Sequence, residues 1–200
     1  MANYRSSRVI PIALILIIVA IAVAALVSLA RAVFFSGSTQ TVSQVDVSES
    51  TLLNTSVNRS VTMTVRGPIV ANEQFHSYEI TITPNNRVLT VYTGYLDQQV
   101  DQIALSNNTP AYEQFVYALD KANLVKGTPF TGDKNDTRGI CATGHVYEFN
   151  VLSAGNSVKM LWTSTCSNAK GSLNANVASL TSLFLNQIPN GKLAIDKVDL

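Results

Sequence analysis

Apolar and polar residues alternate along five stretches of the chain, which is the pattern of half-buried β-strands. The predicted strands lie at 61–66, 78–83, 87–93, about 144–152 and about 157–165. Pro84-Asn85-Asn86 is a turn between the second and third stretches, and Ser153-Ala154-Gly155-Asn156 is a turn between the last two. Each turn is expected to join its two strands as a hairpin, because these residue types favour the backbone angles of tight turns.

Two other stretches place their apolar residues at helical spacing. Thr109-Pro110 is typical of a helix N-cap followed by proline. The pattern predicts a helix over 110–126, ended by Gly127. Its apolar face consists of Tyr112, Phe115, Val116, Leu119 and Ala122. A last helix is predicted from about Leu173 to Ile188, where Pro189 ends it.

Two segments each fit two structures. Residues 96–105 are typical either of a short helical turn or of a strand, and the tail 192–200 of an edge strand or a frayed end. The remaining order is three strands, a helix, two strands and a helix. Strands joined by short turns pair antiparallel. The sequence therefore predicts an α+β fold, with an antiparallel sheet of about five strands and two helices packed on one face.

A long uncharged run precedes this predicted domain. From Val9 to Ala30 there are 22 residues without a charge, rich in Ile, Val, Leu and Ala. At about 1.5 Å of rise per residue such a helix is about 33 Å long, enough for a hydrocarbon core of about 30 Å. Residues 9–31 are therefore predicted to form a transmembrane helix, with the lipid bilayer as its partner.

The charges beside this run predict its orientation. Arg5, Arg8 and the N-terminal amine precede it, whereas Arg31 is the only basic residue that follows before Arg59. The positive-inside bias places residues 1–8 in the cytoplasm and the chain after Arg31 outside the cell membrane, as in a single-pass signal-anchor protein. The alternative is a cleaved secretory signal, although the apolar run exceeds the roughly 7–15 residues typical of such signals.

The segment that follows the run is polar. Residues 32–56 are rich in Ser, Thr and Gln after Phe35, and are predicted to be a linker. Residues 57–200 are predicted to be one exported domain that folds without the anchor. After Ser36 the chain carries 11 basic and 13 acidic residues, a formal charge of −2. Such an even mixture argues against a nucleic-acid-binding protein, which needs a basic face.

The two cysteines frame the last predicted hairpin. Cys141 precedes its first strand and Cys166 follows its second, within two residues of the register that a turn at Ala154-Gly155 sets. Both thiols are expected on the apolar face of the hairpin, together with Phe149 and Trp162. Because an exported domain meets an oxidising compartment, a disulfide is predicted, and two free buried thiols are the alternative.

Other candidate sites are weakly supported. His76 and His145 share strand faces with apolar residues and are interpreted as structural; the alternatives are a metal site or activation of Cys141 as a nucleophile. The acidic loop 133–136 lacks the ligand spacing of a calcium loop. No phosphate-binding or hydrolase motif is found, so no catalytic, cofactor-binding or metal-binding residue is predicted. Glycosylation sequons occur at Asn54, Asn58, Asn107 and Asn135.

Functions from different classes fit these features. The anchor, the linker and the small disulfide-bonded domain predict a non-catalytic binding or envelope-interaction module. The alternative is an envelope hydrolase of cell-wall or surface polymers, with carboxylates such as Glu79 and Glu148 brought together by the fold. A cleft with two converging carboxylates favours the hydrolase, whereas an aromatic-lined groove favours binding. A large exposed apolar patch favours a structural subunit.

Overall fold

The structure is a computed structural model, and it describes Val23 and residues 47–198. Residues 47–198 belong to one compact unit. Among the described residues, no helix has the length and apolar character needed to cross a membrane. Apart from Val23, the predicted span 9–31 lies outside the described residues, as does segment 1–8, so both stay predictions.

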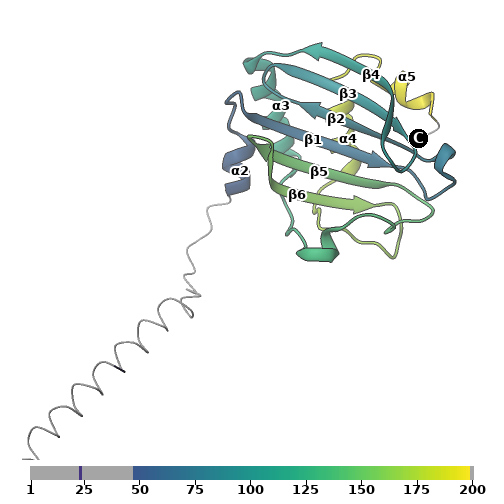
Figure 1. Cartoon of the computed structure of the whole chain (residues 1–200). Coiled ribbons are helices and arrows are strands. Elements are labelled where there is room, and N and C mark those ends of the chain that lie inside the picture. Colours follow the sequence, from purple (N-terminus) through teal and green to yellow (C-terminus); the bar gives the residue numbers. More distant parts are fainter. Residues whose placement is uncertain (1–22, 24–46, 199–200) are drawn as a thin grey trace, which may run out of the picture. The chain divides into compact units, whose positions relative to one another are not determined.

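A six-stranded antiparallel sheet forms the centre of this unit (Figure 1). Its strands are β1 (Arg59–Arg66), β2 (His76–Ile82), β3 (Asn86–Thr93), β4 (Gln98–Ser106), β5 (Val146–Ser153) and β6 (Asn156–Ser164). They lie in the order β4-β3-β2-β1-β5-β6. The first four strands form a meander, and the hairpin β5–β6 pairs with the free side of β1. The predicted α+β class with an antiparallel sheet is confirmed, with six strands rather than five.

The strand register separates apolar from polar side chains. Met63 of β1 lies opposite Ile80 of β2, and both are buried. The next residue, Thr64, lies opposite Glu79 on the other face of the sheet. We call the apolar face the helix side, because the α-helices pack on it, and the polar face the outer face.

Four α-helices in the described part of the chain cover the helix side. They are α2 (Val47–Leu52), α3 (Thr109–Lys121), α4 (Val177–Leu185) and α5 (Gly191–Asp196). Figure 1 shows α3 and α4 behind the sheet. Two 3-10 helices, η1 (Asn72–Gln74) and η2 (Gly132–Asn135), lie in the connections.

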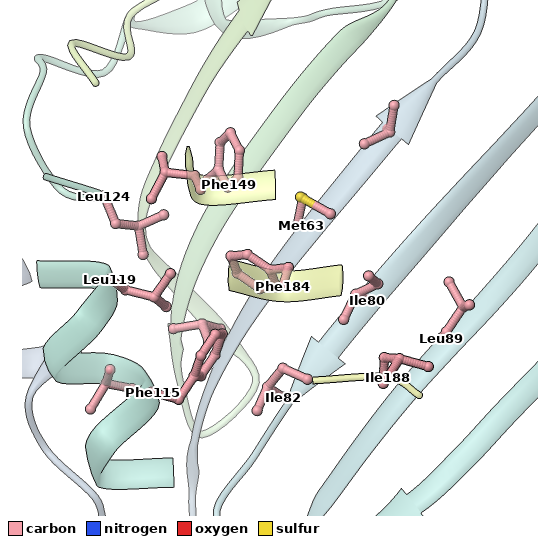
Figure 2. Packing of buried hydrophobic residues seen from close by; sticks show 14 of the residues in the cluster. Met63, Ile80, Ile82, Leu89, Phe115, Leu119, Leu124, Phe149, Phe184 and Ile188 are labelled. Carbon is pink, nitrogen blue, oxygen red and sulfur yellow. The ribbon is translucent and has the colours of Figure 1, made fainter. Parts of the chain in front are cut away.

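Phe184 of α4 packs at the centre of the core (Figure 2). Its ring meets Phe115 of α3 edge-on, with 5.3 Å between the ring centroids, and lies 6.0 Å from the ring of Phe149 on β5. Met63 and Ile80 approach from the sheet. Burying one such side chain contributes about 1.5–3 kcal/mol, so these contacts fix both long helices on the sheet.

Both long helices begin at an asparagine. The side-chain oxygen of Asn108 accepts a hydrogen bond from the N–H of Ala111 at 2.9 Å, and Asn176 caps α4 in the same way. The N-cap predicted at Thr109 is therefore wrong by one residue. The cap at Asn176 also starts the last helix later than the predicted Leu173.

Leu173 belongs instead to an isolated β-bridge with Gly127. Its N–H donates to the carbonyl of Trp162 at 3.0 Å, which ties this residue to β6 before the helix begins. Gly127 has φ +138°, and a Cβ atom there would lie 2.0 Å from the carbonyl oxygen of Ser172. Only glycine fits this position. The first predicted helix also ends early, at Lys121 rather than 126.

Two ambiguous segments are resolved. Most of segment 96–105 belongs to strand β4, whose alternation is interrupted at Val100 by an irregularity in its pairing with β3. The tail contains helix α5, with Ala194 and Ile195 buried. The prediction of an edge strand or frayed end at 192–200 is wrong for residues 192–196, because these apolar side chains pack onto the core.

The predicted linker 32–56 reaches too far. Residues 47–52 form α2, and Leu52 is fully buried in the core while Thr51 is 8% exposed. The compact unit therefore begins before residue 57. A helix this short is stabilised by tertiary packing rather than by helix propensity, so its polar sequence does not predict a helix.

The hairpin β5–β6 turns at Ala154 and Gly155, which both have positive φ, as in a type I′ turn. An irregularity after Val151 shifts the register beyond it by one residue. Trp162 therefore lies opposite Glu148 on the outer face, not beside Phe149 as predicted. A shift of one residue exchanges the faces because side chains alternate.

Candidate binding site

A pocket of about 240 Å³ lies at the end of the sheet where β1 ends. Its walls come from the β1–β2 connection, the β3–β4 turn, the start of β5 and the segment before it. The lining includes Arg66, Phe75, Tyr95, Asp97, Ile140 and Cys141. Helix α2, where the chain enters the unit, contacts β1, β5 and β6 and leads into the opposite end of β1. The end of β1 that contributes Arg66 to the pocket is therefore the end away from α2 (Figure 1).

Tyr95 holds one wall of the pocket. Its hydroxyl donates to the carbonyl of Val70 at 2.7 Å and accepts from the N–H of the same residue at 3.1 Å. Its ring stacks on Phe75, with centroids 4.2 Å apart. Its N–H donates to the side chain of Asn72 at 3.1 Å. The β3–β4 turn is therefore fastened to the β1–β2 connection, and the aromatic pair is held in place.

The disulfide holds the other wall. The sulfur atoms of Cys141 and Cys166 lie 2.08 Å apart, as the predicted pairing requires, with 5.5 Å between the Cα atoms. The N–H of Ile69 donates to the carbonyl of Ala142 at 2.9 Å and joins the two walls. The pocket is therefore largely pre-formed, which reduces the entropy lost on binding.

Some of the charged side chains at the pocket form ion pairs and one does not. Arg66 forms an ion pair with Glu148, which also accepts a hydrogen bond from Thr137. Arg138 forms an ion pair with Asp136 and, by hydrogen bonding to it, lowers the pKa of that exposed carboxyl to about 2. Asp97 lines the pocket without an ion-pair partner in residues 47–198.

Exposed apolar side chains gather around the pocket. Leu96 is 95% exposed at the tip of the β3–β4 turn, beside Tyr95 at 46%. Ile69 and Val70 of the facing connection are 48% and 37% exposed. Isolated exposed apolar residues are ordinary, but several around one pocket mark an interaction surface. We call Ile69, Val70, Tyr95 and Leu96 the apolar rim.

A larger hollow of about 660 Å³ lies on the helix layer. Apart from Tyr147, the lining residues come from one stretch, residues 177–192, which comprises α4, its connection to α5 and the first two residues of α5. The smaller pocket is the better candidate, because several separate parts of the chain form it and hydrogen bonds and a disulfide fix its walls.

The other predicted residues have structural surroundings. His76 pairs with Thr93 across β2 and β3, and the ring of His145 lies 6.4 Å from that of Tyr147. Across residues 47–198, no group of three or more His, Cys, Asp or Glu is placed to hold a metal ion. Cys141 is bonded to Cys166, so it is no free nucleophile for either histidine to activate.

The four sequons differ in accessibility. Asn54 and Asn58 are exposed between α2 and β1. Asn107 donates to the carbonyl of Thr83 at 2.6 Å, and the side-chain oxygen of Asn135 is buried.

The carboxylates of the hydrolase hypothesis lie in one row of the outer face. Glu79 and Glu148 each lie opposite Thr64, on either side of β1. Two strand spacings of about 4.8 Å separate their backbones by about 10 Å. Glu79 accepts hydrogen bonds from Thr64 and Thr81, and Glu148 from Arg66 and Thr137. Neither residue lines either of the two cavities described here.

Neither Leu96 nor Asp97 was predicted from the sequence to belong to a site. The signal available was the tetrad Gly94-Tyr95-Leu96-Asp97, in which two large apolar residues occupy a turn.

In comparisons with known proteins, no family model matches this chain, and no curated protein matches it.

Proposed function

We propose that this protein is a membrane-anchored, extracytoplasmic, non-catalytic binding module. Residues 9–31 anchor it, and the pocket with its apolar rim contacts a partner protein. The observation that carries the proposal is the apolar rim around a pre-formed, aromatic-walled pocket. Leu96 in particular is almost fully exposed and so contributes little burial to folding, which leaves it available for binding.

The size of the pocket supports a protein partner. Pockets for drug-sized ligands usually measure about 300–1,000 Å³. A pocket of about 240 Å³ suits one side chain of a partner whose surface also covers the rim. Four rim residues around one pocket form a local patch, which favours a binding site over the extended interface of a structural subunit.

The hydrolase alternative has less support. Retaining glycosidases need carboxylates about 5–5.5 Å apart, and inverting ones about 6.5–9.5 Å apart around a substrate. Here Glu79 and Glu148 are held by neighbouring side chains in a sheet row, with Thr64 between them. That arrangement suits a structural role on the outer face.

Site-specific cross-linking in native membranes tests the binding site. A photo-reactive amino acid in place of Leu96 is expected to give discrete protein adducts after irradiation. The matched control is the same residue in place of Val57, which is 75% exposed on the α2–β1 connection. Identical adducts from both positions, or none from position 96, would contradict the proposal.

Protease protection tests the proposed orientation. Protease added to intact cells or spheroplasts is expected to digest the chain after residue 36 and to leave the N-terminal segment. Complete protection of the later part, with digestion only after lysis, would place the domain in the cytoplasm.

A further inference from the structure

We propose that the partner segment carries a basic residue beside the apolar side chain that enters the pocket. This inference rests on the proposed function and names the chemistry that the same site selects. It commits to a segment of a partner protein, rather than a lipid surface or a free amine.

The acidic residues on the two segments that carry the apolar rim support the inference. The two arginines of the pocket are already paired, Arg66 with Glu148 and Arg138 with Asp136. Asp97 is exposed beside Leu96, with no ion-pair partner in the described part of the chain. The segments 67–75 and 94–97 contain Glu73 and Asp97 but no lysine or arginine.

The geometry joins the apolar and acidic features. The side chain of Asn72 in η1 accepts a hydrogen bond from the N–H of Tyr95. Glu73 is the next residue of the same 3-10 helix, so it lies near the β3–β4 turn. An apolar side chain seated between Phe75 and Ile140 therefore lies in a pocket that the carboxylate of Asp97 also lines. The partly exposed ring of Tyr95 offers a cation a further favourable contact.

This charge distribution discriminates among partners. Complementary rim charges act mainly on specificity and association rate. An anionic lipid surface is disfavoured, because the carboxylates of Glu73 and Asp97, on the same segments as the apolar rim, would face lipid phosphates. A basic protein segment meets both features together.

A displayed random-peptide library tests the inference on the full-length protein in lipid nanodiscs. Peptides are counter-selected against the Leu96→Ser variant, so that only binders that need the rim are kept. We expect enrichment of peptides with an apolar residue next to Lys or Arg. Asp97→Asn is expected to weaken a selected peptide about fivefold, the scale of one exposed ion pair.

Asp97→Asn is a well-matched variant. Asp97 has φ +52°, and asparagine adopts this left-handed conformation as readily as aspartate. The substitution thus removes charge without straining the turn. Asp120→Asn on α3 is the control, and it should leave peptide affinity unchanged.

The outcomes separate the two proposals. Rim-dependent peptides without basic residues would overturn the inference and leave the proposed function standing. No enrichment over Leu96→Ser would overturn both. Equal competition by spermidine and by the selected peptide, at equal concentration, would identify a free amine as sufficient and overturn the choice of a protein segment.

Discussion

Tyr112 of α3 illustrates how one buried polar group links packing to pH. The residue is 1% exposed, and burial raises the pKa of its phenol to about 12, although nearby Arg59 opposes the shift. Burial also raises the pKa of Tyr78 and Tyr147. In each case the folded protein favours the neutral phenol, because the low-dielectric interior disfavours the phenolate.

The raised values predict a loss of stability at alkaline pH. A group whose pKa is raised by folding stabilises the native state below its unfolded pKa, here about 10, and the stability is lost as pH rises toward the folded pKa. Between pH 10 and 12 the free energy of unfolding should fall by about 1.4 kcal/mol per pH unit through Tyr112 alone. Urea unfolding at several pH values measures this slope.

Tyr112→Phe should make that slope shallower by the contribution of one group. Tyr117→Phe is the matched control, since Tyr117 lies on the same helix and is 46% exposed. Equal slopes for Tyr112→Phe and the unchanged protein would show that burial of this phenol does not govern alkaline stability.

Among the elements, α2 marks where the compact unit begins. It is a six-residue helix in a polar segment, and its importance comes from Leu52, which is fully buried against the core. Removing residues 47–56 exposes the surface that this side chain covers. We therefore expect fragment 57–200, which the sequence predicts to fold without the anchor, to be less stable than a fragment that includes α2.

Leu52→Ala should lower the free energy of unfolding by about 2–5 kcal/mol, the usual cost of a cavity in a core. Val57→Ala, at an exposed position just outside the helix, should change it by less than about 0.5 kcal/mol. Urea unfolding of fragment 45–200 carrying each substitution gives the comparison. Similar values for both would mean that α2 is not part of the folded unit.

The disulfide makes a second contribution at this level, because it joins the segment that precedes β5 to the segment that follows β6. Cys141 and Cys166 are 25 residues apart, and closing such a loop stabilises the folded state by about 2–4 kcal/mol in the chain-entropy account. Reductant should lower the free energy of unfolding by that amount. The Cys141→Ser/Cys166→Ser double variant should start lower and respond no further; a reductant effect of equal size in that variant would point to another cause.

At the scale of the whole molecule, the sequence predicted structure formed by neighbouring residues but not the pairing of segments far apart in the chain. The hairpins and the buried face of α3 follow from neighbouring residues, so period and turn chemistry predicted them. Strand β4 stayed ambiguous because the irregularity at Val100 breaks its alternation. Trp162 was predicted on the wrong face of the sheet because of the irregularity in strand pairing after Val151. No sequence pattern indicates that irregularity.

The candidate site is a product of those long-range pairings. Arg66 and Glu148 are 82 residues apart in sequence, and they meet only because β5 pairs with β1. Tyr95 reaches Val70 because the β3–β4 turn lies beside the β1–β2 connection. Of the site, the sequence predicted only the cysteine pair, which the hairpin brings together locally.

Hydrogen–deuterium exchange on full-length protein in its native membranes tests the central claim most directly. Its amide protection is compared with that of the purified protein in nanodiscs. The account predicts added protection in native membranes within residues 67–75, 94–97 and 137–141, and unchanged exchange along α4 and α5. Equal exchange in the two preparations, or added protection confined to residues 177–192, would contradict the assignment of the binding site.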